Sequence, residues 1–360
     1  MKIKKEIAKR IRERMAQSGL KSSIKDTIKE KAVNPYDVEK IPTGIKQLDA
    51  NLKGGIPRGY LTLLAGYEGS GKSHFVSQII AEGIDQGHMA FLMSGEQSGG
   101  QSNQILTSQL SGGKMMTKVT SKTGFKYSKV DEKVKDFIQK EYEESVQYYE
   151  PSRNVRAAYQ EFLQTLQIAV EEGIDFFIID NLMTLKDVYA SDDMGRGLSD
   201  NTLQGGIANM LAQFASTYNV YVVLAVHKRK VSGQGVSFNI NNEILGSSNV
   251  ANAGGLIIHF DASPAFEGDV QNSGRRAKIT KNRLFGFTDF VGVEVKYDVA
   301  GHRLFSDFDD KEYSWQASFI QKEVEEDFIR KADGLPVERK PYIKYESEDM
   351  YDDRKKIDKK

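Results

Sequence analysis

Apolar residues near the start of the chain recur with helical spacing. Ile3, Ile7, Ile11 and Met15 stand four residues apart and are separated mainly by charged residues, which predicts an amphipathic helix with one narrow apolar face. The first 32 positions also contain eleven Lys or Arg against four acidic residues. We expect residues 1–34 to be a basic linker region whose apolar face needs a partner surface, on its own domain or on a neighbouring subunit.

After residue 35 the pattern changes to short apolar runs that alternate with longer amphipathic stretches. The runs predict strands at 59–66, 88–95, 174–180, 220–227 and 255–260. Helices are predicted from about residue 71 and over 153–172 and 201–218. Because nearly every position in these runs is apolar, we expect a parallel sheet covered on both faces. The fold class is therefore α/β, with a mainly parallel central sheet flanked by helices and an antiparallel C-terminal edge formed by residues 276–305.

Two segments have weaker patterns. Residues 98–150 are polar and rich in Gly and Lys, with a helical piece near 131–145, and their role stays open. Residues 307–360 form a charged, acidic tail outside the motor domain, which we place at 35–306. The aromatic residues of this tail either bind a partner or belong to a packed terminal helix; they are Tyr313, Trp315, Phe319 and Phe328.

Composition excludes some classes of protein. The chain has 50 basic and 50 acidic residues and no cysteine, which rules out disulfides and thiolate metal sites. No apolar run reaches the roughly 18 residues of a membrane span, and the basic start lacks the apolar core of a secretory signal. We expect no membrane partner and a cytoplasmic protein, or one in the host cytoplasm if a phage encodes it.

The sequence GYEGSGKS at 66–73 matches the phosphate-binding loop pattern G-x-x-x-x-G-K-S. Its glycines let backbone N–H groups turn toward phosphate oxygens, Lys72 would neutralise the β- and γ-phosphates, and the Ser73 hydroxyl would bind Mg²⁺. An apolar strand enters the loop and a helix leaves it, as this motif requires. We therefore predict ATP and Mg²⁺ as cofactors, with nucleotide contacts from Gly66, Glu68, Gly69, Ser70, Gly71, Lys72 and Ser73.

Three polar residues at the ends of other apolar strands would complete a hydrolytic site. Asp180 ends the run FFIID and is the expected Mg²⁺ ligand, with Asp175 as the weaker competitor. Glu96 follows the strand at 88–95, which we expect immediately beside the P-loop strand, and could activate water; the alternative is a glutamate in the first turn of a helix. His227 could bind the γ-phosphate or be a helix-capping or core histidine.

Several segments, taken in order, resemble the motor domain of DnaB-type replicative helicases, the group that includes mitochondrial Twinkle and phage ring helicases. They are TGIKQLDANLKGGIPRGYLTLLAGYEGSGKSHF, LMSGEQS, FFIIDNL, VVLAVHKRK, ILGSSNVANAGGLIIHF and KITKNRLFG. The resemblance implies a RecA-like P-loop NTPase assembled as a hexameric ring. It also implies Glu96 as catalytic base, His227 as γ-phosphate sensor, and Lys281 and Arg283 as cations supplied to the neighbouring subunit's site.

The same resemblance assigns a DNA contact to the segment after His227. Lys228, Arg229 and Lys230 begin a Gly- and Asn-rich stretch that would grip the single-strand backbone, although Lys228 or Arg229 could instead face the nucleotide and the stretch could be a plain surface loop. A second loop at 189–201 contains acids and ranks lower. We expect priming activity, a loader and a polymerase to come from other proteins.

The predicted function is an ATP-dependent replicative DNA helicase that moves 5′ to 3′ on single-stranded DNA as a homo-oligomer. A RecA-type recombinase on the same core is the first alternative, and a RecA-fold ATPase that switches a protein partner is the second. The segments KNRLFG and LGSSNVANAGG favour the helicase over the recombinase, and the run HKRK favours a DNA partner.

Overall fold

The computed structural model describes residues 2–17, 32–113, 115–151, 156–229, 240–246, 248–262, 274–307 and 311–332. It divides into two compact units, Met1–Val38 and Glu39–Lys360. The first unit contains helix α1 (Lys2–Gln17), on which Ile7 and Ile11 are both exposed. The expected division of the chain at residues 34 and 306 stays a prediction.

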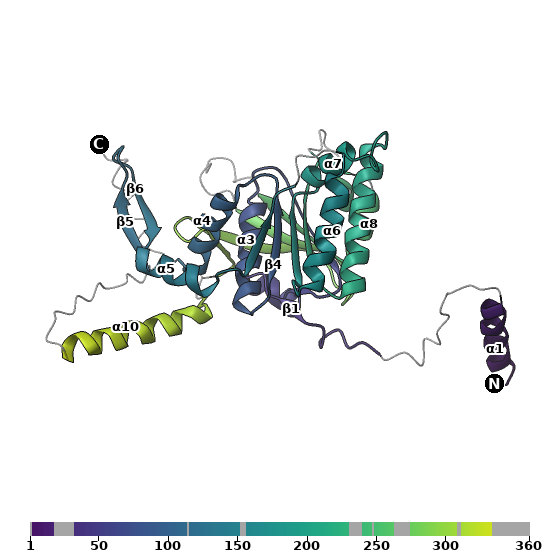
Figure 1. Ribbon diagram of the computed structural model, residues 1–360, viewed down its shortest axis with the longest axis horizontal. Helices are drawn as coiled ribbons and strands as arrows, with labels where there is room; N and C mark the ends of the chain where they lie inside the picture. Colours follow the sequence, from purple (N-terminus) through teal and green to yellow (C-terminus); the bar gives the residue numbers. More distant parts are fainter. Residues whose placement is uncertain are drawn as a thin grey trace. The chain divides into compact units, whose positions relative to one another are not determined.

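Within its described residues, the second unit is built on a nine-stranded sheet with the strand order β13-β12-β11-β10-β3-β9-β8-β4-β7 (Figure 1). The strands are β3 (Leu61–Gly66), β4 (Ala90–Ser94), β7 (Val146–Tyr149), β8 (Phe176–Asp180), β9 (Tyr221–His227), β10 (Leu256–Ala262), β11 (Arg275–Asn282), β12 (Asp289–Asp298) and β13 (Arg303–Phe305). Those from β10 to β7 run parallel, and β11, β12 and β13 are antiparallel. The predicted α/β class with an antiparallel C-terminal edge is confirmed.

Helices cover both faces of this sheet. One face packs against α3 (Lys72–Asp85), α4 (Gly99–Leu110) and α5 (Glu132–Glu141), and the other against α6 (Ala158–Glu171), α7 (Leu182–Ser191), α8 (Asp200–Tyr218) and α9 (Ser248–Ala253). Side chains along β8 alternate between the two cores, with Phe176 and Ile178 in the first and Phe177 and Ile179 in the second. This two-sided burial is the physical reason why the strand sequences are apolar at every position.

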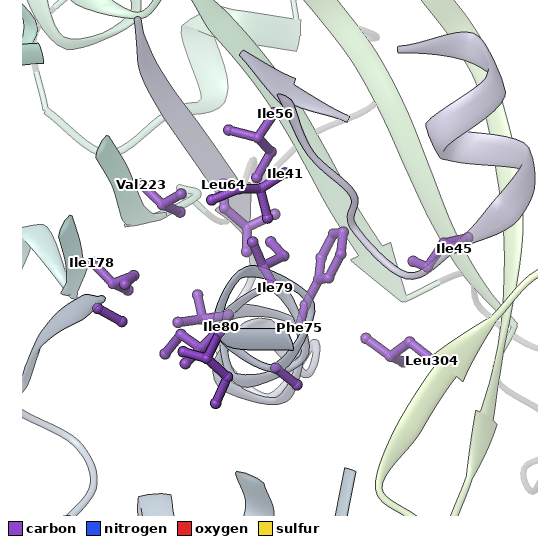
Figure 2. Packing of buried hydrophobic residues seen from close by; sticks show 14 of the residues in the cluster. Ile41, Ile45, Ile56, Leu64, Phe75, Ile79, Ile80, Ile178, Val223 and Leu304 are labelled. Carbon is purple, nitrogen blue, oxygen red and sulfur yellow. The ribbon is translucent and has the colours of Figure 1, made fainter. Parts of the chain in front are cut away.

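Helix α3 lies at the centre of the first core. Phe75, Ile79 and Ile80 project from it toward the sheet (Figure 2), and Phe75 also contacts the ring of Phe260 with 5.1 Å between ring centroids. The remaining elements are small or peripheral: β1 (Lys40–Ile41), α2 (Lys46–Asn51), β2 (Ile56–Pro57), β5 (Met116–Thr120), β6 (Lys126–Val130), the 3₁₀ turn η2 (Ile240–Glu243) and α10 (Ser314–Ala332). The packing of α3 fixes the direction in which the phosphate-binding loop enters the helix.

The strand order corrects one expectation. Strand β4, which leads to Glu96, does not pair with the P-loop strand β3; β9 and β8 lie between them. The crossover helix of a βαβ unit can span more than one strand, so strands that follow each other in sequence need not be neighbours in the sheet. All these strands are parallel, however, so their carboxyl ends meet at one edge.

The aromatic residues after 307 belong to a packed helix. Tyr313, Trp315 and Phe319 are buried, and the Trp315 indole N–H donates to the carbonyl of Leu110 at 2.8 Å. The rings of Trp315 and Phe319 also contact Phe137 on α5. Between the two interpretations of this aromatic group, the structure favours the packed helix; the side chain of Phe328 and residues 333–360 lie outside the described part.

Residues 98–150 contain more structure than the single helical piece predicted from sequence. Helix α4 leads to the β5–β6 hairpin, α5 follows, and β7 then adds the last strand of the large sheet beside β4. No helix in the described part of the chain is long and apolar enough to cross a membrane.

Candidate nucleotide site

The phosphate-binding loop connects the end of β3 with the first turn of α3. Gly69 and Gly71 have positive φ angles of 73° and 96°, a conformation that costs glycine little. A Cβ atom on Gly66 would lie 2.5 Å from the carbonyl oxygen of Phe260, so no larger residue fits there. The loop therefore has the backbone that a phosphate cradle needs, at the positive end of a helix.

Lys72 lies inside this loop. Its Nζ atom donates to the carbonyl oxygens of Gly66 at 3.1 Å and Tyr67 at 2.8 Å. Burial lowers the pKa of Lys72, and the nearby charges of Glu96 and Asp180 oppose that shift. A bound phosphate would offer the same ammonium group a charged acceptor in place of neutral carbonyls.

Asp180 and Ser73 lie together at the end of β8. The Ser73 hydroxyl hydrogen bonds to the Asp180 carboxylate, and burial raises the pKa of Asp180 to about 6. No group of three or more His, Cys, Asp or Glu residues suited to a metal occurs in the described part of the chain. Mg²⁺ usually takes one or two protein oxygens and completes its shell with phosphate and water, so this pair of oxygens fits a nucleotide-bound Mg²⁺.

Asp175, the competing candidate, lies at the opposite end of β8. Its carboxylate is 3.2 Å from Arg58 Nη1 and 2.9 Å from His88 Nδ1. Asp175 is therefore part of a surface ion pair on the edge where the parallel strands begin, away from the phosphate-binding loop.

Asn181 connects the carboxylate of Glu96 with the imidazole of His227. Its Nδ2 group donates to Glu96 Oε1 and lies 3.1 Å from His227 Nε2, and Glu96 Oε1 is 3.3 Å from the same nitrogen. Its Oδ1 atom accepts hydrogen bonds from the backbone N–H groups of Met183 at 2.9 Å and Thr184 at 3.2 Å. One side chain thus caps α7 and joins the proposed base to the proposed sensor.

Sequence reasoning missed Asn181, although a signal was present. An asparagine between an apolar strand and an apolar helix is a strong N-cap signal, and this one directly follows Asp180. The amide has two N–H groups, one for Glu96 and one for a neutral His227 with its proton on Nδ1. Which neighbours the amide would reach could not be read from the local sequence.

The segment that carries Glu96 is held by Tyr148 on β7. The Tyr148 hydroxyl donates to the carbonyl oxygens of Ser94 at 3.2 Å and Gln97 at 2.6 Å. Ser98 then starts α4 with a capping box closed by Gln101. Anchors on both sides of Glu96 give its backbone a defined position, which a catalytic base needs.

Lys281 and Arg283 lie at the other edge of the sheet. Lys281 pairs with Ile257 near the start of β10, which runs parallel to β3. Its Nζ atom donates to the carbonyl oxygens of Ala251 at 2.8 Å and Asn252 at 3.0 Å, and Arg283 Nη2 donates to Asn252 at 2.6 Å. Burial, together with the charge of Arg283, lowers the pKa of Lys281 to about 8. These two cations are together, but away from the chain's own phosphate-binding loop.

Lys228 differs from its expected role in binding DNA. Its side chain is 2% exposed, and Nζ lies 2.8 Å from a carboxylate oxygen of Glu243 and 2.9 Å from one of Asp261. It also lies 4.7 Å from the ring centroid of Tyr67 in the phosphate-binding loop. A buried ammonium group held by two carboxylates is not available to a DNA phosphate, so we remove Lys228 from the DNA-binding set.

The other two cations of this run have different positions. Arg229 is exposed, and its Nη2 atom donates to the carbonyl oxygen of Gly246 at 2.5 Å. Lys230 lies outside the described residues. The stem of this loop is joined to the nucleotide site, because the Lys228 backbone N–H donates to the carbonyl of Gly66 at 3.1 Å.

A group of rings beside the phosphate-binding loop was not predicted. Arg275 Nε donates to the Ser70 carbonyl at 3.2 Å, and its guanidinium lies 5.1 Å from the Tyr297 ring centroid. His74 contacts Tyr297 edge-on, and the Tyr297 hydroxyl is 2.8 Å from His302 Nδ1. Burial lowers the pKa of His74 to about 4, so its ring is neutral at pH 7. A flat ring and a cation next to a phosphate site could hold the nucleotide base.

Comparison with known proteins agrees with this geometry. The family described as "ATPase: KaiC" matches residues 41–241, more than half of the chain. The chain belongs to the KaiC ATPase family. A solved structure of another protein's ATPase domain superposes on this KaiC-family chain with a TM-score of 0.54 at 14% identity, over 75% of this chain and 92% of the other. A likeness at this identity concerns the fold alone, which is RecA-like.

Sequence relatives match only a short part of this KaiC-family chain. It is 43% identical over 70 residues to the DNA repair protein RadA of Mycobacterium tuberculosis, covering 19% of this chain and 15% of RadA. It is 42% identical over 60 residues to the circadian clock protein KaiC3 of Synechocystis sp., covering 17% and 12%. It is 43% identical over 67 residues to Protein RecA of Aquifex pyrophilus, covering 18% and 19%. The chain spans less than a fifth of each relative's length, and the shared property is a RecA-fold, nucleotide-binding ATPase.

Proposed function

We propose that this ATPase is one subunit of a ring-forming DNA helicase that moves along single-stranded DNA. The observation that carries the proposal is the position of Lys281 and Arg283, together at the sheet edge opposite the phosphate-binding loop. Two cations so placed support a site that a neighbouring copy completes. The ordered motifs shared with DnaB-type helicases support a ring and a DNA substrate.

The proposed hydrolysis uses the residues at the carboxyl edge of the sheet. Glu96 accepts a proton from water as the water oxygen bonds to the γ-phosphorus and the bond to the bridging oxygen of ADP breaks. Asn181 holds the Glu96 carboxylate, and Lys72 neutralises charge on the phosphates. Arg283 and Lys281 of a neighbouring copy supply positive charge to the transition state.

Ser73 and Asp180 would hold Mg²⁺, Ser73 directly and Asp180 directly or through water. When bound, Mg²⁺ would neutralise charge on the β- and γ-phosphate oxygens. The buried Asp180 carboxylate gains from such a cation, because burial disfavours its charged form.

His227 is the proposed link between hydrolysis and DNA. Its ring lies next to Glu96 through Asn181, and its backbone carbonyl accepts from the Leu245 N–H at 2.7 Å, at the far end of the loop. A shift of His227 on loss of the γ-phosphate would move the loop stem. Arg229 is the described cation of this loop that we assign to the DNA backbone, together with Lys230.

Steady-state ATPase activity, measured with and without single-stranded DNA beside unwinding of a forked duplex, tests the proposal. We expect DNA-stimulated turnover and strand separation, both lost in Lys72→Ala. The short matches to RecA and RadA keep the recombinase as the second candidate, and strand exchange without unwinding would support it. Turnover that ignores DNA would instead indicate a switch for a protein partner.

A mixing experiment tests the shared site. Arg283→Ala keeps a complete phosphate-binding loop, and Lys72→Ala keeps the cations offered to a neighbour. Each variant alone should lose activity, by about 10³-fold or more if Arg283 acts as an arginine finger. A mixture should regain a measurable fraction, because some Arg283→Ala sites would receive arginine from a Lys72→Ala neighbour. A mixture no more active than its parts would refute a site shared between subunits.

Helix α1 is the proposed contact that helps to close the ring. Its described apolar residues Ile7 and Ile11 are 47% and 42% exposed, as expected of a face that needs a partner surface. Removal of residues 1–32 should shift the ring to smaller species in analytical ultracentrifugation at equal protein concentration. Intact rings after this deletion would refute the contact. A primase, loader and polymerase remain proposed separate partners.

A further inference from the structure

The β5–β6 hairpin is a defined structure that extends from α5 (Figure 1). Met116 and Val130 at its base are buried in the first core. At its turn, the Ser121 N–H donates to the Phe125 carbonyl at 2.7 Å, and the Phe125 N–H donates to the Ser121 hydroxyl at 2.9 Å. Gly124 supplies the positive φ of 84° that this turn needs. The tip is therefore held in one conformation before any partner binds.

One face of the hairpin presents aromatic rings to solvent. Val119 pairs with Tyr127, and Phe125 lies two residues before Tyr127, so all three side chains share a face. Phe125 is 72% exposed and Tyr127 is 46% exposed. Residues two apart on a strand are separated by roughly 7 Å. Two exposed rings at this spacing form a short row on which flat groups could stack.

Positive charge surrounds these rings. Residues 116–130 contain four lysines and no acidic residue, and Lys118, Lys122 and Lys126 are exposed. The fourth, Lys129, forms an ion pair with Glu132 at the hairpin base, with 2.6 Å between Nζ and Oε1. The exposed part of the hairpin thus combines aromatic rings with cations and lacks any carboxylate of its own.

We propose that the β5–β6 hairpin is a second contact for single-stranded DNA, separate from the loop after His227. Exposed rings can stack on bases without reading sequence, and flexible lysines can follow the phosphate backbone. A protein partner of the same charge complementarity would need an acidic surface but would not use open ring faces in a row. The inference rests on the proposed DNA helicase, whose strand would have to pass this hairpin.

The first test measures affinity of the full chain for a fluorescein-labelled oligothymidylate by anisotropy. Phe125→Ala and Tyr127→Ala should each weaken binding by about fivefold or more, and Phe125→Trp should retain it. Phe290→Ala removes a ring that is 59% exposed on β12 and should leave affinity unchanged. ATPase activity without DNA should also be unchanged in the hairpin variants, because no proposed catalytic residue lies in the hairpin.

The second test measures the dependence of this affinity on salt. Combined replacement of Lys118, Lys122 and Lys126 by alanine should reduce the slope of log K against log salt by about 2, since each phosphate contact on a single strand contributes about 0.7. Replacement of Lys296, Lys322 and Lys331, which are also exposed, should not change the slope. A photoreactive thymidine analogue in the oligonucleotide should crosslink to the peptide that contains Phe125.

The outcomes separate this inference from the proposed function. Wild-type affinity and slope in the hairpin variants, with DNA-stimulated turnover intact, would overturn the hairpin contact and leave the helicase standing; a hairpin that binds a protein instead would give this result. Weakened binding in the hairpin variants, in a chain whose ATPase activity ignores DNA, would support the contact and refute the motor. A wild-type chain without affinity for the oligonucleotide would overturn both.

Discussion

At the scale of single residues, the proposed chemistry depends on amide and ammonium groups that sequence motifs do not single out. Asn181 holds Glu96 and lies next to His227, and Lys228 joins the loop after His227 to the phosphate-binding loop through Tyr67. In both cases one buried polar side chain satisfies several neighbours at once. Substitution of either one distinguishes a structural from a catalytic contribution.

Asn181→Ser should separate capping from catalysis. A serine hydroxyl can still cap α7, but it is too short to reach Glu96 and His227. Turnover should therefore fall by about 10- to 100-fold, because the base is no longer held, while the KM for ATP and the melting temperature stay close to wild type. Asn181→Ala should lose the cap as well, at a further cost of about 1 kcal/mol in stability. Normal turnover in Asn181→Ser would show that Glu96 does not need this contact.

Lys228→Met and Arg229→Ala should have opposite consequences. Removal of the buried Lys228 ammonium leaves Glu243 and Asp261 without their cation, which should reduce the free energy of unfolding by about 3–5 kcal/mol. Arg229 is exposed, so Arg229→Ala should leave stability nearly unchanged and weaken binding of single-stranded DNA. Urea denaturation and anisotropy measure the two effects. A stable Lys228→Met variant with weakened DNA binding would restore Lys228 to the DNA-binding set.

At the scale of elements, the apolar strands could be predicted from sequence and the segment between β4 and β7 could not. The interior strands are apolar at every position because both faces are covered, so the predicted runs at 174–180 and 220–227 contain β8 and β9 with ends within two residues. The β5–β6 hairpin is polar and rich in lysine because most of it is exposed. Hydrophobic periodicity carries little information about an element that buries only its base.

Helix α10 provides a test at this scale, because its N-terminal part is docked. Trp315 is fully buried and donates to the Leu110 carbonyl, so Trp315→Ala should reduce the free energy of unfolding by about 3–5 kcal/mol. Ile320 lies on the same helix but is 53% exposed, and Ile320→Ala should change stability little. The comparison uses urea midpoints of the two variants. Equal, small effects would indicate that the aromatic residues serve a partner instead of the core.

At the scale of the whole molecule, stability should depend on a buried histidine. His259 is fully buried, its Nε2 atom is 3.0 Å from Asn241 Oδ1, and burial lowers its pKa to about 3. The unfolded chain takes up a proton near pH 6.5 and the folded chain does not, so folding loses this contribution as pH falls below 6.5. Between pH 6.5 and pH 5 the loss amounts to about 2 kcal/mol.

Comparison of wild type with His259→Gln isolates this group. The difference in free energy of unfolding between the two proteins should shrink by about 2 kcal/mol from pH 7 to pH 5. Carboxyl groups such as Asp49, whose pKa burial raises to about 7, titrate in both proteins and cancel. Urea denaturation at each pH gives the difference, and a value independent of pH would show that His259 takes up a proton in the folded protein.

The sequence by itself determined the features that are local. The phosphate-binding loop, the strand that ends at Asp180 and the alternation of strands with helices all depend on neighbouring residues, through glycine backbone freedom and the spacing of apolar side chains. A carboxylate after each of two apolar strands was enough to predict which acids meet at the sheet edge.

Only the tertiary structure decided which distant groups meet. It set β9 and β8 between β3 and β4, brought Asn181 to Glu96, and surrounded Lys228 with carboxylates from Glu243 and Asp261, 15 and 33 positions further along the chain. The order of strands depends on the path of each crossover helix, and burial of a charge depends on partners brought in from elsewhere. No local pattern encodes either choice, because the energies involved arise between segments that are far apart in the chain.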